Sequence, residues 1–153
     1  MKFLHIADVH IGATPDKDKM WGSRRGEEIY DSFKNIIKIC EEQQVDLLLI
    51  AGDLFNAPPT IQQLRELDYQ FRLTHGTKTI LIAGNHDYIE EGSAWEKYRF
   101  ESDLCILPRD RAANVYIEDL NVCITGFSYG KPEYPERILE RLRPGREGAY
   151  NIL

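Results

Sequence analysis

Two apolar runs with the same ending constrain the fold of this chain most strongly. Residues 47–53 read Leu-Leu-Leu-Ile-Ala-Gly-Asp, and residues 79–87 read Thr-Ile-Leu-Ile-Ala-Gly-Asn-His-Asp. A third apolar run, residues 3–7, leads directly into Asp8-Val9-His10. Continuous runs of this length, bounded by glycine or turn residues, indicate strands that are buried on both faces, as in a parallel sheet covered by helices. The sequence therefore predicts an α/β fold in which three buried strands end in polar side chains.

These polar side chains have the chemistry of metal ligands. In open α/β sheets ligands bind beyond the carboxyl ends of the strands, where these residues stand. Asp8 and His10 are two residues apart and would share one face of an extended chain. Asp53 has two oxygens that can bridge two ions, and Asn85 offers a neutral carbonyl oxygen. Carboxylate and imidazole together suit Mn²⁺, Fe²⁺ or Zn²⁺ better than Ca²⁺ or Mg²⁺, which predicts a transition-metal site.

His86 and Asp87 follow the third strand. His86 is a candidate general acid, and Asp87 is a candidate carboxylate that would orient the ring of His86. Gly52 and Gly84 allow backbone angles and close approaches that a side chain would forbid. Each cluster alone also fits a turn or a helix cap. Three such clusters at three successive strand ends favour a functional site.

The remaining pattern predicts one domain over residues 1–153, without repeats or linkers. A helix is expected over residues 27–44, and Thr60 with Gln63 forms a capping box for a second helix. A short helix over residues 93–100 would begin at Ser93, paired with Glu96 in the same spacing. Further elements are expected as follows: strands at 104–107, 115–117 and 122–125, the last two forming a hairpin, a helix over 134–142 and a strand at 150–153.

Composition limits the partners and the compartment. The net charge is −6, whereas general nucleic-acid binders carry a basic face. Bound divalent cations reverse the local sign, so acidity is compatible with a metal-dependent nuclease. No apolar run approaches the ~18 residues of a membrane span, and the start does not resemble a signal peptide. Three cysteines without a C-x-x-C pair favour free thiols in a reducing cytoplasm.

The segment from Gly12 to Gly26 is expected to be a loop next to the site. Lys17, Lys19, Arg24 and Arg25 are candidates for contacts with phosphates of a substrate strand. The alternative is a solvated surface loop.

The three blocks together resemble a known family. Asp8-x-His10, Gly52-Asp53 and Gly84-Asn85-His86-Asp87 are similar to the first three signature blocks of the calcineurin-like metallophosphoesterases. Residues 3–12 resemble the opening of SbcD-type double-strand-break repair nucleases, and so do the later residues Arg24, Arg25, Glu28, Tyr30 and Phe33. The resemblance implies a β-sandwich flanked by helices, in α-β-β-α layers.

The same resemblance implies a DNA exonuclease that hydrolyses phosphodiesters at a two-metal centre, with Mn²⁺ as the expected metal. His86 would stabilise the transition state and protonate the leaving oxygen, and Asp87 would fix the ring of His86. The family acts with an SbcC-type ATPase and as a homodimer. Independently of the resemblance, the lack of a membrane span predicts no membrane partner.

Two further family blocks, which supply three more histidines, have no counterpart in these residues. The chain is therefore expected to be an N-terminal part of the catalytic domain, truncated before its last strands. Asp8, His10 and Asp53 would hold the first metal, whereas only Asp53 and Asn85 would contribute to the second. Such a piece is expected to be inactive alone. The alternatives are a general calcineurin-like phosphodiesterase or phosphatase, acting on small phosphodiesters or phosphoproteins, and a non-catalytic assembly fragment.

Overall fold

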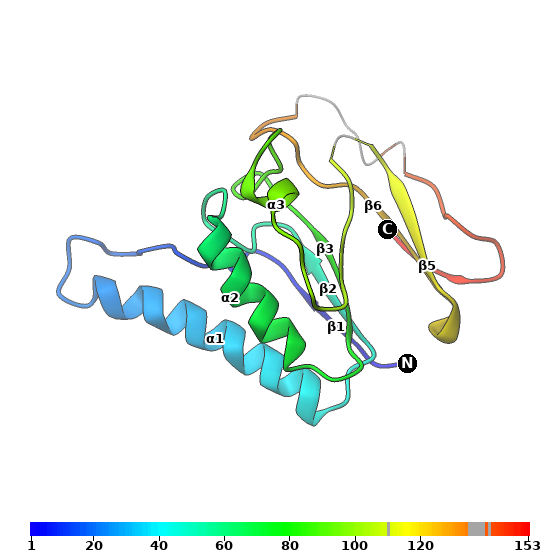
Figure 1. Ribbon diagram of the computed structural model, residues 1–153, viewed down its shortest axis with the longest axis horizontal. Helices are drawn as coiled ribbons and strands as arrows, with labels where there is room; N and C mark the ends of the chain where they lie inside the picture. Colours follow the sequence, from blue (N-terminus) through cyan, green and yellow to red (C-terminus); the bar gives the residue numbers. More distant parts are fainter. Residues whose placement is uncertain (110, 135–139, 141) are drawn as a thin grey trace.

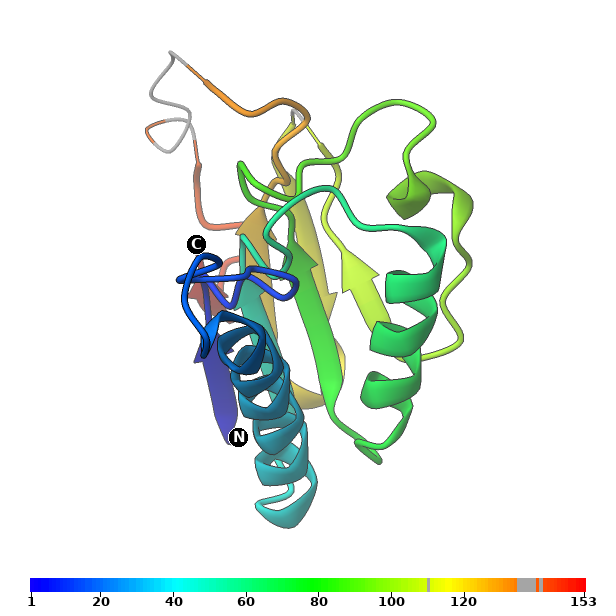
Figure 2. The same cartoon turned by 90° about the vertical axis from the view of Figure 1, so that its left-hand side faces the viewer.

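The protein consists of two stacked β-sheets with helices on one side, as seen in a computed structural model that describes residues 1–109, 111–134, 140 and 142–153 (Figures 1 and 2). Its elements in chain order are β1 (Phe3–Ile6), α1 (Gly22–Glu42), β2 (Leu47–Ala51), α2 (Ile61–Arg72), β3 (Lys78–Ile82), α3 (Ala94–Lys97), β4 (Leu104–Ile106), β5 (Ala113–Ile117), the 3-10 helix η1 (Glu118–Leu120), β6 (Val122–Gly126) and β7 (Tyr150–Ile152). None of the described helices is both long and apolar enough to cross a membrane.

The first sheet has four parallel strands in the order β1-β2-β3-β4. Leu49 of the central strand β2 lies opposite His5 on one side and Ile80 on the other. Residues 47–50 are buried, which confirms the prediction from their continuous apolar run. Because the strands are parallel and adjacent, the segments that follow β1, β2 and β3 meet at one edge of the sheet.

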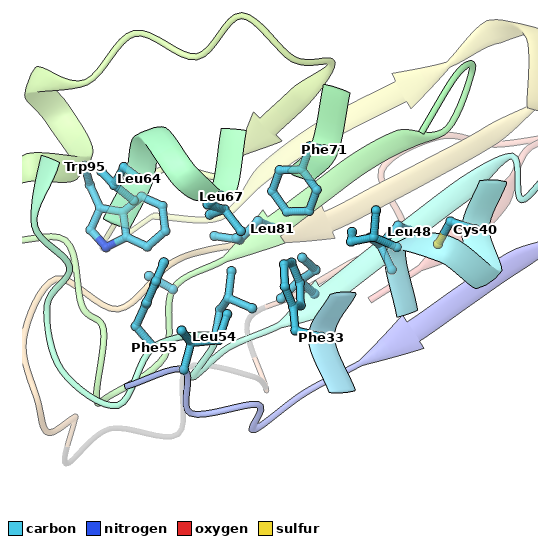
Figure 3. Packing of buried hydrophobic residues seen from close by; sticks show 14 of the residues in the cluster. Phe33, Cys40, Leu48, Leu54, Phe55, Leu64, Leu67, Phe71, Leu81 and Trp95 are labelled. Atoms are coloured by element: carbon cyan, nitrogen blue, oxygen red, sulfur yellow. The ribbon is translucent and has the colours of Figure 1, made fainter. Parts of the chain in front are cut away.

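Helices α1 and α2 cover one face of this sheet (Figure 2). Phe33, Ile37 and Cys40 recur at helical spacing on α1 and are buried in the core between the helices and the sheet. Figure 3 shows Phe33 pointing towards Phe71 of α2, and their rings make an edge contact at 6.1 Å. Helix α1 begins at Gly22 rather than at residue 27, so part of the predicted substrate loop is helical.

The second sheet packs on the opposite face of the first sheet. β5 and β6 form the predicted antiparallel hairpin, and Asn121 turns the chain in a left-handed conformation with φ 50°. β7 pairs parallel to β6. Apolar side chains of both sheets form a second core, with Leu47, Leu49, Ile80, Leu107, Ile117, Val122 and Ile124 buried.

Three of the four expected layers, α-β-β, are therefore present in the described residues. The described α-helices α1, α2 and α3 lie on the side of the first sheet that faces away from the second sheet (Figure 1). The helix predicted over residues 134–142 lies largely outside the described residues.

The two predicted capping boxes have different outcomes. Thr60 accepts a hydrogen bond from the Gln63 N–H, and the Gln63 side chain accepts one from the Thr60 N–H, which confirms the capping box of α2. Ser93 makes no side-chain cap, so this prediction is wrong. Glu96 instead accepts a hydrogen bond from the N–H of Gly92 at 2.8 Å.

Asp68 of α2 attaches the helical layer to the segment that leads into β4. Its buried carboxylate accepts hydrogen bonds from the N–H groups of Glu101 and Ser102 and from the Tyr98 hydroxyl. Burial works against ionisation of Asp68, but the hydrogen bonds from Ser102, Glu101 and Tyr98 outweigh it and lower its pKa below the ordinary value.

We expect Asp68→Asn to lower the free energy of unfolding at pH 7 by about 2–3 kcal/mol, because two backbone N–H groups and the Tyr98 hydroxyl lose their charged acceptor. A lowered folded-state pKa gives stability that is present above the unfolded-state pKa, about 3.9, and is lost as pH falls through the folded value. The difference in the free energy of unfolding between Asp68→Asn and wild type should therefore become smaller below pH ~4. Urea unfolding at pH 7 and pH 3 measures it. Asp103→Asn, at an exposed residue, is the control, and an equal loss in both variants at pH 7 would contradict the assignment.

Candidate metal and active site

The three predicted ligand clusters lie side by side at the carboxyl ends of β1, β2 and β3. The N–H of Asp8 donates to the Gly52 carbonyl oxygen at 3.2 Å, and the N–H of His10 donates to that of Asp53 at 3.0 Å. On the other side, the N–H of His86 donates to the Asp53 carboxylate at 2.9 Å. Asp53 thus lies between the other two clusters.

Left-handed backbone conformations, and not an extended chain, position the first two clusters. Asp8, His10 and Asp53 have φ values of 54°, 54° and 51°. The prediction that Asp8 and His10 share the face of an extended strand is therefore wrong, since β1 ends at Ile6. A left-handed residue other than glycine costs on the order of 1–3 kcal/mol and is typical of functional sites.

Two glycines permit the close approach of the second and third clusters. Gly52 has φ 91°, and a Cβ atom there would lie 3.2 Å from the Cα of Gly84. A Cβ atom on Gly84 would lie 2.6 Å from the backbone nitrogen of Asp53 and would overlap its carboxylate. These segments therefore pack at a distance that no side chain at Gly84 allows.

Three ionisable side chains converge in this arrangement. His10, Asp53 and His86 each offer a ligand atom, and these atoms lie within 4.8 Å of one another. The rings of His10 and His86 meet edge to face at 4.8 Å. Asp8 lies beside them, with Oδ1 at 4.0 Å from Nε2 of His10, and its side chain is 73% exposed. Asn85 is exposed at the start of the loop that carries His86.

The donor set fits a divalent transition metal. Within the described residues, Nδ1 of His10 is buried and has no hydrogen-bond partner. Buried polar atoms are nearly always paired, so an orphan of this kind points to a ligand-binding role. Carboxylate oxygens and imidazole nitrogens around a small space are the ligands that Mn²⁺, Fe²⁺ and Zn²⁺ accept.

His86 is oriented by a backbone group that the sequence did not indicate. Its Nδ1 lies 3.2 Å from the carbonyl oxygen of Asn56, in the loop after β2. A proton on Nδ1 would donate to this oxygen and leave Nε2 as the free ring nitrogen. The ring is exposed, so Nε2 can exchange a proton with a bound group.

Asp87 does not play the predicted orienting role towards the ring of His86. Its fully buried carboxylate accepts hydrogen bonds from the N–H groups of Gly84, at 2.7 Å, and Phe55, at 3.1 Å. Burial raises the pKa of Asp87 and remains dominant, although the backbone donors Phe55, Gly84 and Leu54 lower it and nearby Asp53 raises it further. Asp87 therefore joins the loop after β3 to the segment after β2.

The four predicted substrate contacts lie on two different elements. Lys17 and Lys19 are exposed in the turns before α1, whereas Arg24 and Arg25 lie in its first turns. Arg24 pairs with Glu28 at 3.2 Å, as expected for residues four apart on a helix. The indole of Trp21 donates to the Asp16 carboxylate at 3.2 Å, so Trp21 anchors the loop.

Comparison with known proteins agrees with this geometry. The model of the calcineurin-like phosphoesterase family matches residues 1–144. The chain therefore belongs to the calcineurin-like phosphoesterase family.

Several of its relatives are named as DNA double-strand break repair proteins or as a nuclease subunit. It is 32% identical to the DNA double-strand break repair protein Mre11 of Methanocaldococcus jannaschii, in a match that covers 99% of this chain and 41% of the relative. The Mre11 protein of Sulfurisphaera tokodaii is 35% identical, over 99% of this chain and 40% of the relative. The SbcD component of the SbcCD nuclease of Bacillus subtilis is 30% identical, over 77% of this chain and 30% of the relative. The chain thus spans less than half the length of each.

Proposed function

We propose that this chain forms part of the catalytic domain of a metal-dependent DNA repair nuclease of the SbcD and Mre11 type. The observation that carries the proposal is the convergence of His10, Asp53 and His86, with Asp8 beside them, at three adjacent strand ends. The names of the relatives supply the substrate class. The proposed activity is that of an exonuclease, which removes nucleotides from DNA ends.

The proposed metal ligands are Asp8, His10 and Asp53 for one ion, with Asp53 and Asn85 contributing to a second. Mn²⁺ is the proposed ion for both sites. A divalent cation held there supplies Lewis-acid stabilisation of a phosphoryl group and lowers the pKa of water towards neutrality. Asp53 and Asn85 are the two ligands that we propose for the second ion.

The residues of this chain then have separate roles. Asp53, buried and central, sets the position of the ligands through the N–H of His86. His86 is exposed and oriented by the Asn56 carbonyl oxygen at Nδ1, and in its imidazolium form it would donate the proton on Nε2 to the leaving oxygen. Asp87 acts as a positioning residue, because its carboxylate holds Gly84 and Phe55 in place beneath the site.

Lys17, Lys19, Arg24 and Arg25 are the proposed contacts with the phosphates of the DNA strand. We also propose that the protein works with an SbcC-type ATPase and as a homodimer, as its family resemblance implies. Its proposed compartment is the cytoplasm, because the substrate is DNA and the three cysteines are free thiols.

A second candidate function is a general phosphodiesterase that acts on small esters. The net charge of −6 favours it, because a surface of this sign repels a polyanion away from the metal centre. The two functions share the same metal chemistry and differ in substrate, so a substrate comparison separates them.

The test measures hydrolysis by the full-length protein with Mn²⁺ on linear double-stranded DNA and on bis-(p-nitrophenyl) phosphate. We expect cleavage of both, and cleavage of DNA that weakens steeply with salt, as phosphate contacts require. His86→Gln should lower kcat by about 10²–10⁴-fold, the usual contribution of a general acid, with Mn²⁺ affinity retained.

His75→Gln is the matched control, because His75 is exposed at the end of α2 and pairs with Glu41 far from the strand ends. Hydrolysis of the small ester alone would establish the general phosphodiesterase. No turnover of either substrate would establish the non-catalytic alternative, and full activity of His86→Gln would refute its assigned role.

A further inference from the structure

The loop that carries Asn85 and His86 begins where the first sheet ends. Ile82, the last residue of β3, lies opposite Ala51, the last residue of β2, and β4 ends opposite Leu81. Within the described residues, neither neighbouring strand continues as far as Ala83. The two backbone groups of Ala83 instead bond to the segment that follows β6: its N–H donates to the Ser128 hydroxyl oxygen at 3.0 Å, and its carbonyl oxygen accepts from the N–H of Tyr129 at 2.9 Å.

Tyr129 also holds the far end of the loop, together with Arg109. The N–H of Ile89 donates to the carbonyl oxygen of Tyr129 at 2.8 Å. The carbonyl oxygen of Ile89 accepts from the guanidinium of Arg109 at 3.2 Å. Tyr129, in the segment that follows β6, therefore binds both ends of the loop over residues 83–89, and Ser128 adds a second contact at Ala83.

The Ser128 hydroxyl has a fixed orientation. Its side chain is fully buried, and its single proton is donated to the carbonyl oxygen of Leu107 at 2.6 Å. A lone pair then remains for the N–H of Ala83. The backbone N–H of Ser128 donates to the Pro108 carbonyl oxygen at 2.8 Å, so Ser128 is itself held by the segment after β4.

We propose that Ser128 and Tyr129 form a clamp that positions Asn85 and His86 against Asp53. Ser128 is a positioning residue, since its hydroxyl reaches the site only through Ala83. The consequence for metal binding and catalysis rests on the proposed function, whereas the clamp itself rests on the contacts of Ala83 and Ile89.

Removal of the Ser128 hydroxyl leaves two buried backbone groups unpaired, the N–H of Ala83 and the carbonyl oxygen of Leu107. The backbone of Ala83 then becomes more mobile. Gly84, the next residue, packs so closely on Asp53 that a small displacement of the loop would change this contact. Replacement of a residue that positions a metal ligand without binding the metal itself typically lowers metal affinity or activity by ~10–100-fold.

The experiment compares Ser128→Ala with Thr77→Val in the full-length protein. Thr77 is a matched control, because its hydroxyl is also buried and donates to a backbone carbonyl oxygen, that of Val45 at 2.7 Å, but at the other end of β3. Amide hydrogen exchange, measured by mass spectrometry without metal, should rise over residues 83–89 in Ser128→Ala only. Mn²⁺ affinity and hydrolysis of bis-(p-nitrophenyl) phosphate should fall about 10–100-fold in Ser128→Ala and stay near wild type in Thr77→Val.

Unchanged exchange over residues 83–89 in folded Ser128→Ala, or an equal rise in Thr77→Val, would overturn the clamp. Faster exchange with unchanged Mn²⁺ affinity and turnover would overturn the positioning role. If wild type itself hydrolyses no phosphodiester, the proposed function fails, and the exchange comparison still decides whether the clamp exists. Ser128→Cys, which keeps an atom in place of the hydroxyl oxygen but hydrogen-bonds only weakly through sulfur, replaces Ser128→Ala in the same comparison if the alanine variant does not fold.

Discussion

Replacement of Asp53 by alanine in the full-length protein is expected to abolish Mn²⁺ binding and to reduce phosphodiester hydrolysis to background. Asp53 is the central member of the cluster, 8% exposed, and lies between the segments that carry His10 and His86. It is also the one residue assigned to both ions, so its loss removes a ligand from each. Calorimetric titration with Mn²⁺ measures the binding directly.

Asp53→Ala should change the free energy of unfolding of the metal-free protein much less than it changes Mn²⁺ binding. Asp53→Ala removes an acceptor from the N–H of His86, but it also removes the charge that raises the pKa of the buried Asp87. The wild type should gain about 2.7 kcal/mol at a Mn²⁺ concentration of 100 times Kd, whereas the variant should gain nothing. Thermal unfolding with and without Mn²⁺ tests this.

Asp46→Ala is the matched control for a lost carboxylate. Asp46 directly precedes β2, at the end opposite the site, and accepts a hydrogen bond from the N–H of Lys2 at 2.6 Å. We expect this variant to bind Mn²⁺ like wild type. Mn²⁺ binding that survives in Asp53→Ala would refute the assignment of the central ligand.

Gly84→Ala is the second change with a large expected effect, although it adds only one methyl group. The added Cβ atom would lie 2.6 Å from the backbone nitrogen of Asp53 and would overlap its carboxylate, so one of the two segments must move. Overpacking of this kind costs about 1–3 kcal/mol. A displacement near 1 Å at reacting groups costs about 10²-fold in rate, so we expect a loss of at least that size in hydrolysis.

Gly76→Ala separates this steric effect from a general loss of stability. Gly76 has φ 87°, but a Cβ atom there meets nothing within 4 Å. The variant should therefore lose about 1–2 kcal/mol from its left-handed backbone and keep full activity. Urea unfolding and turnover are measured on both variants, and wild-type turnover in Gly84→Ala would show that the close packing of the two segments is not required.

Local sequence pattern was sufficient to predict the strands of the parallel sheet and the strand ends at which the candidate site lies. The runs 47–51 and 79–83 are apolar at every position except Thr79, and a continuous apolar run of this kind is typical of strands that are covered on both faces. Parallel strands then bring their carboxyl ends to one edge of the sheet. Thr60 and Gln63 make their contacts within one helical turn, so the start of α2 was also predictable. The start of α1 was not predictable in this way. Gly22 and Gly26 are poor helix formers, so the sequence does not indicate that the helix begins at Gly22.

Contacts between distant segments decided how the site is held. Asp8, His10 and Asp53 take left-handed conformations because the three segments bond to one another, and no residue type among them demands it. The partners of Asp87 differ from the prediction because burial places its carboxylate among backbone N–H groups, away from a ring that is exposed. Ser128 is 45 residues from Ala83 in the chain, so only the packing of the second sheet on the first could place its hydroxyl there. The sequence alone therefore determined which groups stand at the strand ends. Tertiary structure decided their orientation, because hydrogen bonds between loops carry no local pattern.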